Sequence, residues 1–196
     1  LYAESNNMTI MDSCLDRIEE LFAVEELPDK GKKEINTYES EYVVEYKNVC
    51  FSYGKKEVLH DVSFGLKENS MTALVGKSGS GKSTIANLLV RFWDINSGTI
   101  YIGGIDIKEL PLSVLMNQIS MVFQNVYLFE DTIYNNILMG RSDATEQEVI
   151  EAAKKARCYD FVMELPNGFQ TIIGEGGASL SGGEKQRISI ARSILK

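Results

Sequence analysis

The sequence predicts an α/β layered domain, and three observations lead to this prediction. Residues 42–53 and 58–66 are rich in β-branched and aromatic residues, which is typical of strands. Residues 71–75 form a short apolar run that leads directly into a glycine-rich loop, as a buried parallel strand does. Helical periodicity follows at once over residues 83–92, so strand and helix alternate along the chain.

The remainder of the chain continues this alternation. Two further strands are expected, over residues 98–102 and 119–123. Helical patterns are expected over four ranges, which are 132–139, 145–157, 159–165 and 181–196. Because residues 132–165 contain helical patterns alone, this block is expected to be a helical insertion into the layered domain.

The first 27 residues differ from the rest. Met8, Met11, Leu15, Ile18 and Phe22 recur at three- and four-residue steps, which predicts a helix with one apolar stripe. The acidic residues around the stripe favour a solvated helix that packs on its own domain. The helix begins without a cap, however, which is expected of a helix that continues a longer, removed one.

Residues 28–41 are polar and rich in lysine and glutamate, and they are expected to be a linker. The globular domain then occupies residues 42–196. A chain of 196 residues is long enough for one such domain with its own core and a short appendage.

Composition excludes some partners. The net charge of −8 argues against a nucleic-acid partner, because phosphate backbones select basic faces. No run approaches the roughly 18 consecutive apolar residues that a membrane-spanning helix requires. The three cysteines are far apart and lack CxxC spacing, which indicates reduced thiols rather than a metal site.

The glycine-rich loop reads Gly76-Lys77-Ser78-Gly79-Ser80-Gly81-Lys82-Ser83 and fits the pattern of a phosphate-binding loop. Triphosphate oxygens carry dense negative charge, so their site needs several convergent donors that approach closely. Gly76, Gly79 and Gly81 have no side chain to block that approach. The backbone N–H groups of the loop and the positive end of the following helix are expected to surround the β-phosphate.

Three side chains at the end of the loop complete this predicted site. Lys82 is expected to reach the β- and γ-phosphate oxygens, the Ser83 hydroxyl to ligate Mg²⁺, and Thr84 to donate near the α-phosphate. The alternative is a chance glycine-rich turn, which the predicted strand before it and the helix after it disfavour. The loop alone does not separate kinases, GTPases and transport ATPases, since all of them use it.

A second motif, Leu180-Ser181-Gly182-Gly183-Glu184-Lys185-Gln186-Arg187, resembles the signature of ATP-binding-cassette (ABC) proteins. A serine hydroxyl and glycine N–H groups at a helix N-terminus can hold a γ-phosphate. The resemblance implies that Ser181, Gly182 and Gly183 hold the γ-phosphate of an ATP molecule bound to the loop of a second nucleotide-binding domain. ATP would thus join two such domains.

Two single residues extend the resemblance, which covers residues 53–187. Gln124 lies at the end of a predicted strand and is similar to the Q-loop glutamine of the family, which implies a role in Mg²⁺ ligation and catalysis. Tyr53 resembles the aromatic residue on which adenine stacks, and such stacking is worth roughly 1–3 kcal/mol for nucleic-acid bases. The resemblance implies a P-loop NTPase fold with an antiparallel β subdomain and a helical subdomain.

The chain departs from the family pattern in two respects. Glu184 stands where the family most often has Gln; the helix dipole favours this charge, whereas a nearby phosphate does not. The family's next elements, an apolar strand ending in Asp-Glu (Walker B) and a switch histidine, are not found. The single histidine, His60, precedes the loop and is interpreted as structural. We therefore expect an incomplete domain, truncated at the C-terminus before Walker B and inactive alone, from a parent that is an ATPase.

Three segments resemble the exporter branch of the family. Residues 171–177, which include Glu175, are similar to the loop that contacts the coupling helices of an exporter's own transmembrane domain. Residues 124–137 are similar to the exporter Q-loop region, and residues 12–21 resemble the segment that joins the last membrane helix to the ATPase domain. The alternative for Glu175 is an ordinary loop carboxylate. The resemblance implies a protein of the cell membrane whose nucleotide-binding domain lies on the cytoplasmic face.

The resemblance also implies a mechanism. Two domains close on two ATP molecules and turn the membrane domain outward, and hydrolysis reopens them. Lys82, Gln124 and Ser181 are the implied catalytic residues, acting by positioning and charge neutralisation. One alternative is a degenerate half of a heterodimeric exporter that binds ATP but hydrolyses it poorly. Another, a soluble ABC protein of chromosome maintenance or translation, is disfavoured by the short gap between the motifs and by the acidic charge.

Overall fold

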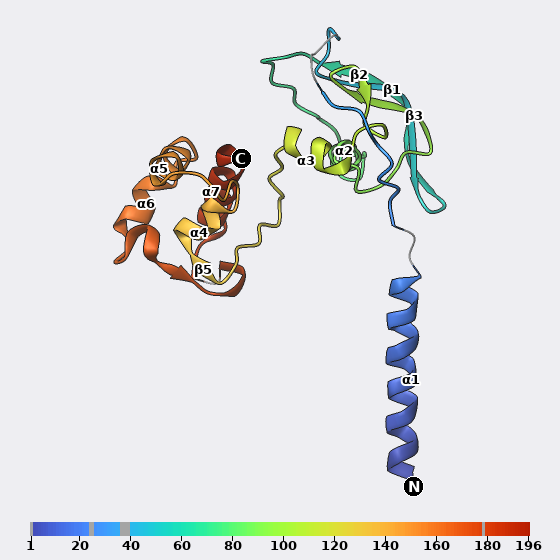
Figure 1. Cartoon of the computed structure of the whole chain (residues 1–196), viewed down its shortest axis with the longest axis horizontal. Helices are drawn as coiled ribbons and strands as arrows, with labels where there is room; N and C mark the ends of the chain where they lie inside the picture. The colour runs from blue at the N-terminus through green and yellow to red at the C-terminus, as the bar shows by residue number, and fades with distance from the viewer. Residues whose placement is uncertain (1, 24–25, 36–39, 178) are drawn as a thin grey trace. The chain divides into compact units, whose positions relative to one another are not determined.

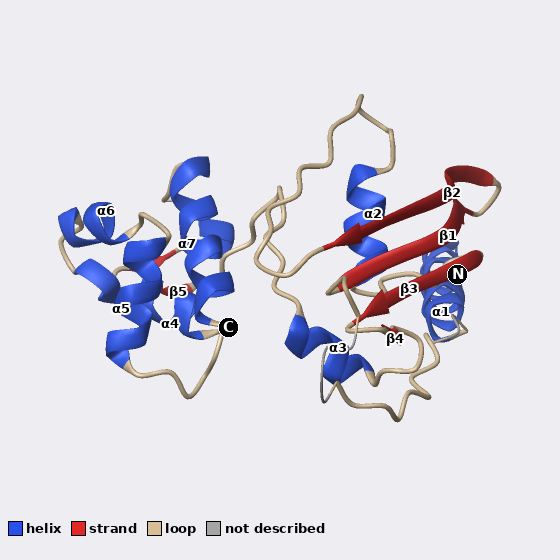
Figure 2. Ribbon diagram, turned by 90° about the horizontal axis from the view of Figure 1, so that it is seen from above, coloured by secondary structure: helices blue, strands red, loops and turns tan. Residues whose placement is uncertain are grey.

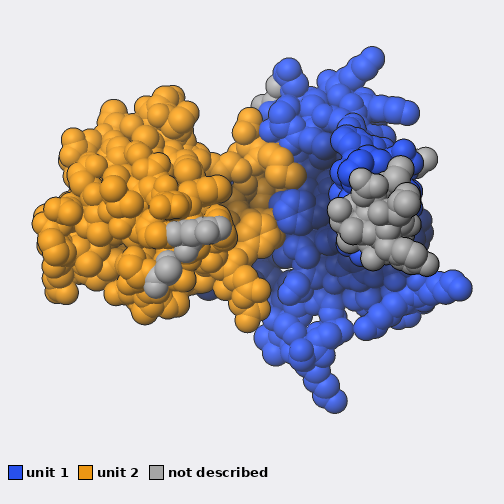
Figure 3. Space-filling view, turned by 90° about the horizontal axis from the view of Figure 1, so that it is seen from below, with its two compact units in different colours: residues 1–115 blue, residues 116–196 orange. Residues whose placement is uncertain are grey.

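The computed structural model describes residues 2–23, 26–35, 40–177 and 179–196, and it describes no side chain at residues 2–10 and 175. The chain divides into two compact units, residues 1–115 and residues 116–196, which Figure 3 shows in different colours. An antiparallel sheet in the first and a set of helices in the second confirm the predicted mixed α/β class.

The first unit begins with helix α1 (Tyr2–Phe22), as its apolar periodicity predicts (Figure 1). Met11, Leu15, Ile18 and Phe22, the described members of its apolar stripe, are all exposed. The expectation that this stripe packs on its own domain is therefore wrong for these residues, because an amphipathic helix buries its apolar face only against a partner. The side chain of Met8 lies outside the described residues. Among the helices that the structure describes, none combines the length and apolarity needed to cross a bilayer.

The first part of the predicted linker is fixed on the domain. The Asp29 carboxylate accepts a hydrogen bond from the Leu112 N–H at 3.0 Å, which satisfies a free donor at the start of helix α3 (Leu112–Gln118). A Cβ atom at Gly31 would lie 2.2 Å from the carbonyl carbon of Leu110, so this close approach requires glycine. The sequence did not predict α3 or this contact.

The sheet of the first unit is antiparallel and has the strand order β2-β1-β3-β4 (Figure 2). Its strands are β1 (Val44–Tyr53), β2 (Lys56–Leu66), β3 (Ser97–Ile102) and β4 (Ile105–Asp106). The three longer strands were predicted from their β-branched and aromatic residues, and the turn between β1 and β2 falls at Gly54 and Lys55 as expected. β1 is an inner strand that pairs with β2 and β3, with Phe51 opposite Leu59 of β2 and Tyr46 opposite Ile100 of β3.

Tyr46 joins the sheet to helix α2 (Lys82–Leu89). Its ring is buried and stacks on Phe64 with the centroids 4.5 Å apart, while its hydroxyl donates to the Ile85 carbonyl at 2.8 Å. Burial raises the pKa of this hydroxyl, so it remains a donor at neutral pH. The helix that begins at the glycine-rich loop is thereby fixed to β1.

Two strand predictions are wrong. Residues 71–75 form no strand, and Met71 and Val75 are 98% and 92% exposed. Residues 119–123 form no strand either. A parallel strand is stable only when neighbouring strands satisfy its backbone and helices cover its faces. Within the described residues, no strand pairs with either run.

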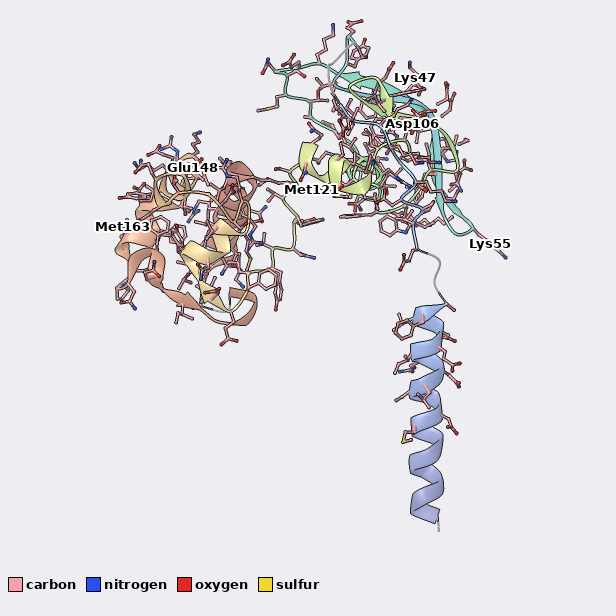
Figure 4. The ribbon with its side chains drawn as sticks, in the orientation of Figure 1. Lys47, Lys55, Asp106, Met121, Glu148 and Met163 are labelled. Carbon is pink, nitrogen blue, oxygen red and sulfur yellow. The ribbon has the colours of Figure 1, made fainter. Side chains whose placement is uncertain are left out.

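The second unit is mainly helical. Its elements are β5 (Asp131–Thr132), α4 (Ile133–Leu138), α5 (Glu146–Lys155), α6 (Tyr159–Glu164), β6 (Ile172–Ile173) and α7 (Gly182–Leu195), with short 3₁₀ turns at Gly168–Gln170 and Glu175–Gly177. All four helices were predicted. Thr145 begins α5 with a capping box, in which the Glu148 side chain accepts the Thr145 N–H in return; Glu148 is labelled on α5 in Figure 4.

The core of the second unit joins α7 to the predicted helical block. Leu128, Ile137, Val149 and Val162 are buried together with Ile188, Ala191 and Leu195 of α7. The prediction of a separate insertion at residues 132–165 was therefore too narrow, because α7 supplies one side of its core.

Candidate functional site

The glycine-rich loop turns sharply into α2. Gly79 and Gly81 have φ angles of +80° and +89°, in the left-handed region that glycine adopts without strain. Gly81 is the N-cap residue of α2, so the helix N-terminus opens directly at the loop. Free backbone N–H groups and the positive end of the helix dipole thus coincide here.

Gly76 and Gly81 both lie close to neighbouring side chains. A Cβ atom on Gly81 would lie 2.7 Å from Leu59 Cδ2, and one on Gly76 would lie 2.6 Å from Ser80 Oγ. The first contact places the loop against β2, because Leu59 belongs to that strand. The loop is therefore a compact cradle of backbone that rests on the hairpin formed by β1 and β2.

Lys82 lies over this cradle. Its ammonium group donates to the carbonyl oxygens of Gly76 and Lys77, each at 2.9 Å. The side chain is half-buried, Ser83 is exposed and Thr84 is buried. A strongly hydrated ammonium held among unhindered N–H groups fits an anionic ligand with several oxygens.

The same residues fit the ligands that the sequence predicts. The unblocked backbone and the lysine suit the oxygens of ATP, and the exposed Ser83 hydroxyl suits Mg²⁺. No cluster of three or more His, Cys, Asp or Glu residues that could hold a metal ion occurs in the described part of the chain.

Tyr53 lies at the end of β1, in the same unit as the loop. Two residues earlier on the strand, Phe51 pairs with Leu59, which in turn lies against Gly81. The predicted base-stacking ring and the residue that contacts Gly81 thus both belong to the β1–β2 hairpin, although the register of the pairing shifts between Phe51 and Ser52. Its turn carries Lys55, which Figure 4 labels at the tip of the hairpin.

The signature motif forms the start of α7 in the second unit. Ser181 is the N-cap, and a Cβ atom on Gly182 would meet nothing within 4 Å, so no other residue crowds Gly182 at the start of the helix. Gly183 and Ser181 are exposed. This arrangement can present donors to an anion.

Glu184 completes a capping box with Ser181. One of its carboxylate oxygens accepts the Ser181 hydroxyl at 2.8 Å and the Ser181 N–H at 2.7 Å. These hydrogen bonds lower the pKa of Glu184, and the positive charge of Arg187 lowers it further. Glu184, which departs from the family pattern, therefore stabilises the start of the helix. In this geometry its carboxylate accepts the hydrogen bond that the Ser181 hydroxyl donates.

The other predicted residues are placed as follows. Gln124 is exposed and lies in a loop of the second unit. Residues 171–177 contain β6 and a 3₁₀ turn with positive φ at Gly176 and Gly177, while the side chain of Glu175 lies outside the described residues. His60 is exposed on β2, with its Nδ1 atom 3.0 Å from a Glu57 carboxylate oxygen, and it takes no part in the loop.

The predicted site residues are divided between the two units. Tyr53 and residues 76–84 belong to the first unit, whereas Gln124 and Ser181–Gly183 belong to the second. Sequence reasoning missed Trp93, which contacts Tyr53, and the pair Asn136 and Arg192 in the second unit. Only the helical spacing of Arg192 from Ile188 and Leu195 hinted that this arginine faces the core.

Comparison with known proteins agrees with the two motifs. A family model described as ABC transporter matches residues 59–196. The ATP-dependent lipid A-core flippase of Haemophilus influenzae (strain 86-028NP) is 47% identical over 182 residues, which cover 90% of this chain and 31% of the flippase. The flippase of the same name from Desulfotalea psychrophila (strain LSv54 / DSM 12343) is 49% identical over 152 residues, which cover 78% of this chain and 27% of the flippase.

A solved structure is also similar. It is described as a bacterial Atm1-family ABC exporter with ATP bound, and it matches with a TM-score of 0.82 and 41% identity over 96% of this chain and 34% of that chain. The chain thus spans about a third of the length of these relatives. The match of the family model to most of the chain, together with the loop and signature geometry, shows that this chain belongs to the ABC transporter family, as an exporter-type nucleotide-binding domain.

Proposed function

We propose that this chain binds Mg-ATP through residues 76–84, with Tyr53 as the stacking surface for adenine. The observation that carries the proposal is the position of Lys82, whose ammonium lies 2.9 Å from two carbonyls of a loop with two left-handed glycines. Those two hydrogen bonds can be exchanged for stronger ones to phosphate oxygens, because charge-assisted pairs are favoured.

Each residue of the loop has a distinct role in this proposal. The N–H groups around Gly79 and Gly81 bind the β-phosphate, Lys82 binds the β- and γ-phosphates, and Thr84 donates near the α-phosphate. Mg²⁺, held by the Ser83 hydroxyl, would neutralise charge on the phosphates. Gln124 remains a predicted second ligand and a predicted catalytic residue together with Lys82 and Ser181.

We further infer a partner for the start of α7. The proposed donors are the N–H groups of the exposed Gly182 and Gly183 and the Ser181 hydroxyl, and they would bind the γ-phosphate of ATP held by a second nucleotide-binding domain. Ser181 can donate its hydroxyl only after releasing the Glu184 carboxylate, since one proton serves both acceptors.

In the whole protein, the proposed function is ATP hydrolysis coupled to export across the cell membrane, with this domain on the cytoplasmic face. The names of the relatives, lipid A-core flippases and an Atm1-family exporter, support an exporter. Residues 171–177 are the proposed contact to the coupling helices of the protein's own transmembrane domain. A degenerate half that binds ATP but hydrolyses it poorly is the second candidate, and measurement of ATPase turnover in the whole protein separates the two.

The binding proposal is tested by calorimetric titration of the chain with Mg-ATP. Replacement Lys82→Ala should weaken binding at least tenfold, because it removes the only side-chain cation proposed to contact the phosphates. Lys55→Ala, at the hairpin turn, is the matched control and should bind as the wild type does. Equal affinity of Lys82→Ala and the wild type would overturn the proposed role of the loop.

A further inference from the structure

The ring of Tyr53 is held by two other aromatic rings of the first unit. Trp93 lies edge-to-face with it, with centroids 5.1 Å apart and an interplanar angle of 89°. Phe51 makes a second edge-to-face contact at 4.7 Å and 87°. Phe51 is buried, whereas Tyr53 and Trp93 are 37% and 45% exposed. Phe51 therefore belongs to the core, and Trp93 forms part of the open surface beside Tyr53.

The loop that carries Trp93 is bonded to the strand that carries Tyr53. The Asn96 side-chain oxygen accepts the N–H of Ser52 at 2.7 Å, and the Asn96 N–H donates to the Cys50 carbonyl at 3.1 Å. Ser52 directly precedes Tyr53 in the chain. The two half-exposed rings are thus fixed to one another through backbone as well as through their own contact.

Arg91 and Asp94, which flank Trp93 in the chain, form an ion pair that closes this loop. The buried guanidinium of Arg91 donates to both carboxylate oxygens of Asp94, at 3.0 and 3.2 Å, and also to the carbonyl of Pro28 at 3.1 Å. Arg91 has a φ of +54°, which a non-glycine residue adopts only when its surroundings hold it there. The geometry of the loop is therefore set by buried interactions and not by Trp93 itself.

We propose that Trp93 is a positioning residue for base recognition: its perpendicular contact fixes the Tyr53 ring so that this ring is preorganised to stack on adenine. The inference rests on the proposed function, since it takes the nucleotide to be bound at residues 76–84. A ring held in its binding orientation loses less rotational freedom when the base stacks on it. Edge-to-face aromatic pairs stabilise by amounts that correspond to roughly a twofold to tenfold change in affinity.

A positioning role of Trp93 predicts effects on binding that a general role in folding does not predict. Trp93 should affect only ligands that contain a base, because it acts through Tyr53 and not through the loop. It should also have no effect once the Tyr53 ring is gone. Its partial exposure and the separate anchoring of the loop mean that its removal leaves the core intact.

The experiment compares the affinities of Mg-ATP and Mg-tripolyphosphate for the wild type, Trp93→Ala, Trp93→Phe, Tyr53→Ala and the double variant Tyr53→Ala/Trp93→Ala. Tripolyphosphate binding is measured by displacement of a fluorescent ATP analogue. Tyr101→Ala is the matched control, since Tyr101 pairs with Glu45 at the other end of β1. Circular dichroism verifies that each variant is folded.

We expect Trp93→Ala to weaken ATP binding about threefold to tenfold, to leave tripolyphosphate binding unchanged, and to have no further effect in the Tyr53→Ala background. Trp93→Phe should restore most of the affinity, because a phenyl edge can make the same contact. Equal losses for ATP and tripolyphosphate, or an undiminished loss in the Tyr53→Ala background, would overturn the proposal. Unchanged ATP affinity in Trp93→Ala would do the same while leaving the proposed function intact. A wild-type chain that binds no ATP would instead refute the proposed function, and this inference with it.

Discussion

Arg192 of α7 and the buried Asn136 of α4 are joined by two hydrogen bonds. The guanidinium donates from Nε to the Asn136 carbonyl at 2.7 Å and from Nη2 to the side-chain oxygen at 3.0 Å. Asn136 in turn binds the backbone of Phe129 and Thr132 with its amide. The segment that follows Gln124 is therefore fixed to the helix that begins at Ser181, within one unit.

Asn136→Ala should lower the free energy of unfolding by about 2–3 kcal/mol, because it removes a buried side chain that bonds three partly buried backbone groups of Phe129 and Thr132. Arg192→Ala should cost about 1–2 kcal/mol. The double variant should lose less than the sum, since both replacements break the hydrogen bond from Nη2 of Arg192 to the side-chain oxygen of Asn136. Urea denaturation provides the measurement, with the exposed Lys155→Ala as control. Strict additivity would show that the two side chains do not act together.

Glu184 should make the stability of the second unit depend on pH. Its pKa is lowered in the folded chain by the Ser181 hydrogen bonds and by Arg187, so its contribution is complete above the unfolded-state pKa of roughly 4.3 and is lost as the pH falls through the folded-state pKa. Glu184→Gln should therefore be less stable than the wild type at neutral pH, and the difference should shrink below about pH 4.

Unfolding midpoints in urea, measured between neutral and acidic pH, test this expectation. Glu164→Gln is the control for removal of one exposed carboxylate that belongs to no capping box. A stability difference between the wild type and Glu184→Gln that stays constant from pH 7 to about pH 3 would contradict the assigned role of the ionised carboxylate.

Gly79→Ala and Gly81→Ala form a matched pair in the loop. Both place a methyl group at a left-handed φ, which costs about 1–2 kcal/mol. Only Gly81→Ala also drives that methyl into Leu59, whereas Gly79 has nothing within 4 Å of its Cβ position. Gly81→Ala should therefore lower the midpoint temperature of thermal unfolding more than Gly79→Ala does. Equal decreases would show that the contact with β2 is not tight.

When Gly31 is replaced by Ala, the segment that leads from α1 into the domain should separate from residues 109 and 110. The new methyl group would meet the backbone of Leu110, and the amides of Lys32 and Lys33 would lose their bonds to the Glu109 carbonyl. Hydrogen exchange should accelerate at these two amides and remain unchanged in β1. Unaltered exchange at Lys32 and Lys33 would indicate that the segment adapts to the methyl group.

Sequence periodicity predicted the elements whose stability is local. The helices of the second unit carry their own caps, such as the capping boxes of Thr145 and Ser181, and the β1–β2 hairpin carries its own turn. The strands predicted at residues 71–75 and 119–123 depend on neighbours from elsewhere in the chain, so their apolar runs alone could not establish them.

The same contrast between local and long-range interactions applies to the candidate site. The loop at residues 76–83 and the signature at residues 180–187 are contiguous motifs whose spacing carries their chemistry, so both could be found in the sequence. Trp93 and the pair Asn136 and Arg192 act across separations of 40 and 56 residues, and no local pattern marks their partners. Such contacts become visible only in the folded chain.

The most direct test of the account is amide hydrogen exchange of this chain with and without Mg-ATP. The loop N–H groups are proposed to bind the phosphates and Tyr53 to stack on the base, so exchange should slow at residues 76–84 and at the end of β1. Residues 145–165 should be unaffected. Slower exchange only in other parts of the chain, or an unchanged exchange rate in the loop at saturating Mg-ATP, would contradict the central claim that this loop is the nucleotide site.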